Sequence, residues 1–142
     1  MSLDIWKFVH NVTRLRRRTP IIRCRSGEPA SHEALADAEC EQLGDASIER
    51  RYMCQGAVNT VRLLQLTRAT LFEDAKEYGA TALIEEGWTC DIFRRGKDTY
   101  EVVVRYSAIM AKASKAGPAT PVAIREARGV PGMMTILRVV SE

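Results

Sequence analysis

The sequence lacks long apolar runs. Its 142 residues contain no stretch of about eighteen apolar residues that could cross a membrane as a helix. No apolar segment follows a charged start near the N-terminus, as it would in a secretory signal. We therefore expect an intracellular protein and place it in the cytoplasm. With 46% hydrophobic and 27% charged residues, the composition is typical of one soluble domain with a real core.

Motifs for metal and cofactor chemistry are missing as well. The four cysteines form no CxxC pair, the two histidines supply no zinc-type spacing, and no glycine-rich phosphate loop is present. We expect free thiols, no metal site and no cofactor. No catalytic motif is specific enough to assign a reaction, so enzymatic activity stays open and a non-catalytic role is favoured.

The net charge of +3 conceals a partition along the chain. Residues 1–25 carry +6, residues 26–49 carry −7 and residues 50–142 carry +4. The basic arm could neutralise phosphates, but it lacks interleaved aromatics and an acidic block follows it, so nucleic acid is not the favoured partner. We expect the arginines of the arm to pack near an acidic edge. That edge consists of Glu33, Asp37 and Glu41.

Residues 1–18 have the pattern of a basic amphipathic helix, because apolar side chains recur at helical spacing and basic ones lie mostly away from them. Such a helix could dock onto its own domain, contact a membrane surface, act as a mitochondrial presequence or bind a partner. These alternatives stay open. We divide the chain into a basic amphipathic helix and arm, residues 1–25, and a single α+β domain, residues 26–142.

The segment after the arm contains signals for a strand and a helix. Residues 20–25 form a short extended segment that begins at a proline. Ser31 is a suitable N-cap for a helix over about 31–43, and Gly44 stands where such a helix would end.

The middle of the chain contains one ambiguous pattern and one clear pattern. Residues 61–66 suit either a helix or a partly buried strand, and the strand is preferred. Thr70 and Glu73 form a capping box, which predicts a helix over about 70–78 that ends before Gly79.

Residues 88–95 and 99–111 predict an antiparallel hairpin at the centre of the sheet. Strand alternation gives each segment one apolar face, with Trp88 on the first and Tyr106 on the second. The two faces coincide only if the loop holds an odd number of residues, so we expect a three-residue loop at 96–98. The same register pairs Cys90 with Val104 and Ile92 with Val102.

Three further segments complete the predicted fold. A strand at 81–84 continues into the hairpin past Gly87, which marks a bulge or a bend. A short helix covers about 121–128. Residues 133–140 form a strand that is apolar on both faces, and such a strand is either central or an edge covered by another subunit. The expected fold is α+β, with an antiparallel or mixed sheet and helices mainly on one face.

Aromatic side chains could meet in a ligand pocket where the 70–78 helix crosses the sheet. The candidates are Phe72, Tyr78, Trp88, Tyr100 and Tyr106, with Glu85 as a polar neighbour. The alternative is that these rings simply fill the core. A pocket would favour a small apolar or aromatic ligand, whereas a filled core would favour assembly.

Two features suggest catalysis. Cys24 lies between Arg23 and Arg25, whose positive charge favours the thiolate, so it is the candidate reactive thiol. Cys90 is expected on an apolar sheet face, where burial would make it inert. A polar site near Glu85–Thr89 is the second catalytic interpretation, because strand irregularities often accompany active sites.

The order of strand, capped helix ending in Tyr78-Gly79-Ala80, strand and hairpin strand resembles small β-α-β-β modules such as dodecin-like and related bacterial stress-protein domains. The resemblance covers residues 60–111 and implies oligomerisation through the sheet, with no functional residue carried over. We favour a non-catalytic small-molecule-binding or assembly module that forms homo-oligomers. The alternatives are a small enzyme and a peripheral membrane or targeting role for residues 1–18.

Overall fold

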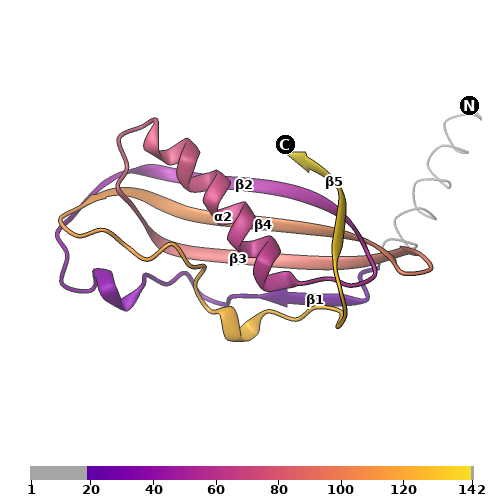
Figure 1. Ribbon diagram of the computed structural model, residues 1–142. Coiled ribbons are helices and arrows are strands. Elements are labelled where there is room, and N and C mark those ends of the chain that lie inside the picture. Colours follow the sequence, from indigo (N-terminus) through magenta and orange to yellow (C-terminus); the bar gives the residue numbers. More distant parts are fainter. Residues whose placement is uncertain (1–18, 142) are drawn as a thin grey trace, which may run out of the picture.

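The computed structural model describes residues 19–141 and shows an antiparallel sheet with one helix packed across it (Figure 1). The strand order is β1-β3-β4-β2-β5. The elements are β1 (Ile22–Arg25), β2 (Cys40–Gln55), α2 (Thr60–Lys76), β3 (Ala82–Gly96), β4 (Thr99–Ala113) and β5 (Thr135–Ser141), with 3-10 turns at Glu33–Leu35 and Ile124–Glu126. The expected α+β class is confirmed.

The main core lies between α2 and one face of the sheet. Leu63 and Leu64 of α2 are fully buried in the same cluster as Tyr52 of β2 and Tyr106 of β4. Because side chains alternate along a strand, the other face of β2, β3 and β4 carries mostly polar and charged residues. This other face is called the open face below.

The central hairpin of β3 and β4 is confirmed, together with the register that its apolar faces dictate. Trp88 pairs with Tyr106 and Ile92 pairs with Val102. β4 lies between β3 and β2, so the hairpin occupies the middle of the sheet.

The connection of the hairpin differs from the expected three-residue loop. Lys97 and Asp98 form a two-residue turn, with Asp98 at φ 57°, and the register shifts between Arg94 and Gly96. The extra residue of this bulge is Arg95. It restores the odd count that places both apolar faces on the same side of the sheet.

The expected bulge at Gly87 is confirmed. Ile84 pairs with Ile109 and Gly87 pairs with Ser107, so β3 has one residue more than β4 across this step. Glu85 adopts a left-handed conformation, with φ 49°. The bulge therefore re-aims the side chains around it, which is how strands commonly position polar groups.

The helix expected over about 31–43 is wrong. Only Glu33–Leu35 forms a 3-10 turn, and β2 begins at Cys40, which pairs with Ala113 of β4. The predicted helix had a thin apolar stripe and like charges four residues apart, which weaken a helix. Pairing with β4 supplies the backbone hydrogen bonds instead, and Gly44 lies at a register shift within β2.

The strand preferred for residues 61–66 is wrong, and the helix expected over 70–78 is too short. Both segments belong to α2, which begins after Asn59, whose side chain accepts from the backbone N–H of Arg62. Thr70 lies inside the helix, and its hydroxyl donates to the carbonyl of Leu66 at 3.0 Å. The apolar run at residues 61–66 is too short to distinguish the helical period from the strand period, so the prediction of a strand failed.

The helix expected over about 121–128 is reduced to the turn Ile124–Glu126. Ala123 has a left-handed φ of 52°, which a continuous helix excludes. The expected C-terminal strand is confirmed as β5, and it lies at an edge of the sheet.

The predicted amphipathic helix at residues 1–18 lies outside the described residues. Within the described part of the basic arm, Arg23 pairs with Asp91 of β3 at 3.1 Å. Between Thr19 and Ser141, no helix is long and apolar enough to span a membrane.

Candidate functional site

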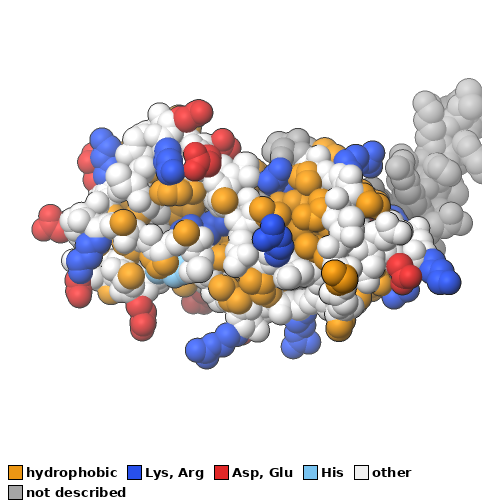
Figure 2. Space-filling view, in the orientation of Figure 1, with side chains coloured by type: hydrophobic (Ala, Val, Ile, Leu, Met, Phe, Trp, Pro, Cys, Tyr) orange, Lys and Arg blue, Asp and Glu red, His pale blue; other side chains and the backbone are white. Residues whose placement is uncertain are grey.

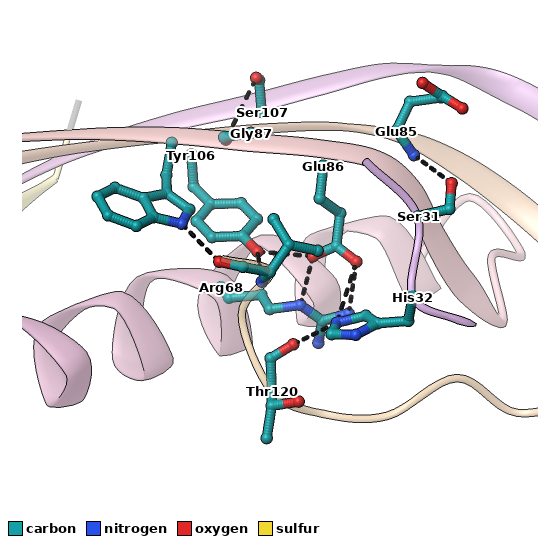
Figure 3. Close-up of polar contacts among 11 residues, drawn as sticks. Ser31, His32, Arg68, Glu85, Glu86, Gly87, Tyr106, Ser107 and Thr120 are labelled. Carbon is teal, nitrogen blue, oxygen red and sulfur yellow. Dashed lines mark hydrogen bonds and ion pairs between the residues drawn. The ribbon is translucent and has the colours of Figure 1, made fainter. Parts of the chain in front are cut away.

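The bulge of β3 turns the carboxylate of Glu86 beneath α2. Arg68 of α2 donates to both of its oxygens, from Nε to Oε1 at 2.6 Å and from the guanidinium to Oε2 at 3.2 Å. Tyr106 of β4 donates its hydroxyl proton to Oε1 at 2.6 Å. Glu86 and Arg68 are buried, so three elements meet at one enclosed carboxylate (Figure 3).

His32 lies at the edge of this cluster, next to the loop that contains Thr120. Its Nε2 lies 2.6 Å from the carbonyl oxygen of Thr120 and 3.6 Å from Oε2 of Glu86. A carbonyl oxygen only accepts, so Nε2 carries a proton. The imidazole is partly exposed and borders a recess of about 660 Å³, which residues 30–34, 118 and 121–126 line. His32 is thus the member of the cluster nearest to solvent.

Burial and the charge of Glu86 determine the protonation of the other members of the cluster. Burial raises the pKa of the Tyr106 hydroxyl, and the charge of Glu86 raises it further, so this tyrosine stays neutral. Burial alone would lower the pKa of Arg68, but its hydrogen bonds and ion pair with Glu86 raise it. The arrangement is therefore an ion pair that ties the bulge to α2, with its carboxylate fully occupied by protein donors.

The structure separates the two glutamates of the polar site expected near Glu85–Thr89. Figure 3 shows the carboxylate of Glu85 pointing away from that of Glu86. The backbone N–H of Glu85 donates to the hydroxyl of Ser31 at 3.0 Å, so Ser31 fastens the bulge rather than capping a helix. The two carboxylates do not share a proton or a substrate position.

The aromatic candidates do not all come together. Trp88, Tyr100 and Tyr106 are buried in the main core cluster, with Phe72 packed against it. Tyr78 is 70% exposed and lies outside the group. The indole N–H of Trp88 donates to the carbonyl of Val122 at 2.8 Å, which anchors the 121–128 segment over the core.

A hollow of about 640 Å³ lies on the open face beside the bulge. Gly87 contributes no side chain there, and hydroxyl groups surround the space. The polar side chains that line it are Arg25, Ser47, Glu49, Thr89, Arg105 and Ser107.

The charges around this hollow are unequal. Arg105 donates to Glu49 at 2.6 Å, and Nε of Arg51 lies 3.7 Å from the same carboxylate, so both arginines have an acidic partner. Arg25 makes no ion pair or hydrogen bond through its side chain with any other residue between Thr19 and Ser141. The hollow therefore has one uncompensated guanidinium at its rim.

Cys24 lies in β1 with its side chain buried, whereas the exposed side chains of Arg23 and Arg25 alternate to the open face. The two arginines therefore do not surround the Cys24 thiol as the sequence suggested. A hydrogen bond with Cys90 lowers the pKa of Cys24 to about 7, and the backbone of Arg128 assists. The same contact and burial raise the pKa of Cys90. The chain's four cysteines are free.

Apolar side chains are exposed along the β5 edge of the sheet. Leu137 is 55% exposed, Val139 39% and Val140 40%, and Met133, just before the strand, is 90% exposed. Figure 2 shows hydrophobic side chains gathered between α2 and β5 on the helix side. We call residues 133–140 the β5 edge below.

No family model, curated protein or solved structure matches this chain. The part of the chain from Thr19 to Ser141 also holds no group of three or more histidine, cysteine or acidic side chains placed to bind a metal ion.

Sequence reasoning missed the pairing of Arg68 with Glu86 and the part played by His32. One signal was available: Arg68 interrupts the buried stripe of α2 between Leu64 and Leu71. A cation at such a position requires a buried anion opposite, because an unpaired buried charge is very costly.

Proposed function

We propose that the protein is a non-catalytic assembly module whose β5 edge pairs with a second copy of the chain. The observation that carries the proposal is the exposure of this edge. Seven large hydrophobic side chains are exposed among the described residues, and four of them lie within residues 133–140. Exposed apolar side chains are common singly, but a group of them along an edge strand favours association.

Edge strands of monomeric proteins are usually protected by charges, prolines or bulges. β5 has no proline and a single charge, Arg138, so the bulge where its pairing with β2 shifts register between Met53 and Cys54 is its main protection. Its outer backbone groups face no other described strand. Full burial of a leucine or valine side chain contributes about 1.5–3 kcal/mol, so covering this edge provides a substantial driving force.

A second copy of the chain fits this edge because of symmetry. Two β5 strands that pair antiparallel about a two-fold axis cover the same residues on both subunits and close the open edge. The order β2-α2-β3-β4 keeps the β-α-β-β arrangement of the resemblance, with β2 in place of the strand expected at 61–66, and that resemblance implies assembly through the sheet.

A charge on the β5 edge tests this proposal. We expect Leu137→Lys to convert the oligomer of the full chain to a monomer in analytical ultracentrifugation. Burial of a charged lysine in the interface would remove it from water, which is unfavourable. Tyr78→Lys is the matched control, since Tyr78 is also an exposed hydrophobic residue and lies outside the β5 edge. Unfolding curves of both variants check that the fold is kept.

Two outcomes contradict the proposal. One is an unchanged oligomer in Leu137→Lys. The other is a monomeric chain whose β5 amides are protected from hydrogen exchange at every concentration, which would show that another part of the same chain covers the edge.

A second candidate function is binding of a small anionic molecule in the hollow beside Gly87. The volume of about 640 Å³ lies within the range of ligand sites. The unpaired guanidinium of Arg25 and the hydroxyls of Ser47, Thr89 and Ser107 supply donors for a carboxylate or phosphate group. This ligand class differs from the apolar or aromatic molecule that the aromatic residues suggested.

We also propose an intracellular location for the protein. The four thiols are free, which suits a reducing compartment. The enzymatic alternative has weaker support, because protein donors occupy the carboxylate of Glu86. The membrane or targeting alternative rests on residues 1–18 and stays a separate proposal.

A further inference from the structure

Cys24 and Cys90 face each other across the pairing of β1 with β3. Directly opposed residues of antiparallel strands have Cα atoms about 4.5–5.5 Å apart. Disulfides span Cα separations of about 4.4–6.8 Å. The backbone therefore already holds the two residues at a separation that a disulfide can bridge.

The surroundings of the pair suit thiol chemistry. The backbone N–H of Arg128 donates to Sγ of Cys24 at 3.4 Å, which stabilises negative charge on that sulfur. The hydrogen bonds with Cys90 and with the backbone of Arg128 lower the pKa of Cys24 to about 7, against the opposing effect of burial. Cys90 has a raised pKa and keeps its proton, so the two sulfurs have different roles.

A hollow at the edge of the sheet lies close to this pair, although neither cysteine lines it. β1 is an edge strand, and a hollow of about 580 Å³ lies beside it, lined by Ile21, Ile22, Arg23, Arg128 and Gly129. Arg128 thus contributes both to this hollow and to the contact with Cys24.

We propose that Cys24 and Cys90 are a thiol–disulfide site that a peroxide oxidises, and that the bond staples the edge strand β1 to β3. The Cys24 thiolate attacks one oxygen of hydrogen peroxide and breaks the O–O bond. A sulfenic acid forms on Cys24, and the departing hydroxide takes a proton to become water.

The sulfur of Cys90 then attacks the sulfenic sulfur of Cys24. The S–S bond forms, the S–O bond breaks, and the leaving hydroxide takes the Cys90 proton as a second water. The two sulfurs lose two electrons together, and the peroxide gains them. A thiol reductant reverses the reaction, so the staple depends on the redox conditions.

Mass spectrometry of the full chain tests this site. The reduced protein is treated with hydrogen peroxide, its remaining thiols are alkylated, and peptides are mapped without reduction. We expect a cross-linked peptide pair that contains Cys24 and Cys90, free thiols at Cys40 and Cys54, and loss of the link after treatment with dithiothreitol. The oxidised chain should also melt at a higher temperature than the reduced chain.

Single substitutions separate this site from general oxidation. Cys40→Ser is the matched control, because Cys40 is exposed, and this variant should keep both the link and the shift in melting temperature. Cys24→Ser and Cys90→Ser should lose both. The proposal is overturned if wild-type Cys24 and Cys90 remain reduced or oxidise only to sulfinic acid, or if the products are links between chains through Cys40. These readouts concern β1 and are independent of assembly at the β5 edge.

Discussion

Arg68 and Glu86 form a bidentate ion pair inside the protein, with Nε of the arginine 2.6 Å from Oε1 of the glutamate. The pair joins the middle of α2 to the bulge of β3. Tyr106 adds a third hydrogen bond from β4. The sheet and its covering helix are therefore connected by a polar contact as well as by apolar packing.

Removal of one member of this pair should be strongly destabilising. In Arg68→Met, Glu86 keeps a buried charge without its cation, and we expect a loss of about 3–5 kcal/mol in the free energy of unfolding. Denaturant titration measures this loss. Adding Glu86→Gln to that variant should recover part of the stability, because the amide is neutral and its oxygen still accepts from Tyr106.

That double variant also provides the control. If Arg68→Met costs less than 1 kcal/mol, or if the two substitutions are simply additive, the contact is not the buried pair described above. Coupled neighbours give non-additive changes, whereas independent sites add.

Two glycines should respond differently to substitution by alanine. A Cβ at Gly129 would collide with the backbone carbonyl of Val58, while a Cβ at Gly87 would lie 3.6 Å from the hydroxyl of Ser26, an ordinary contact. We expect Gly129→Ala to cost about 1–3 kcal/mol, as overpacking does, and Gly87→Ala to cost under about 1 kcal/mol. Thermal unfolding of both variants checks this, and equal losses would contradict the close approach at Gly129.

The hollow on the open face should bind small anions through Arg25. We expect inorganic phosphate or benzoate to raise the melting temperature of the wild type, and this shift to disappear in Arg25→Gln. Arg23→Gln is the matched control, because Arg23 lies on the same strand and pairs with Asp91. Gly87→Val should abolish the shift by filling the hollow.

Equal shifts in the wild type and Arg25→Gln would show that the anion acts elsewhere. Loss of the shift in Arg23→Gln as well would indicate general screening of charge rather than a site.

Alternation in the central hairpin was enough to predict its register. Trp88 and Tyr106 pair as expected because a slip of one residue would bury charged side chains. A glycine within a strand pattern indicated the bulge at Gly87, and a run that is apolar on both faces indicated the C-terminal strand. These features depend on neighbouring residues, which a sequence displays directly.

The segments around Ser31 and residues 61–66 could not be predicted in this way. β2 forms because its backbone pairs with β4, whose partner residues lie more than forty residues further along the chain. The contact between Arg68 and Glu86 likewise joins α2 to β3 across the fold. Local propensity is overridden at such places by pairing that only the folded topology brings about.

Light scattering of the full, unmodified chain tests the assembly proposal most directly. The account predicts a mass of at least two chains at tens of micromolar protein, falling toward the monomer on dilution. A strict monomer across that range would contradict it, whether or not the β5 edge is protected from hydrogen exchange.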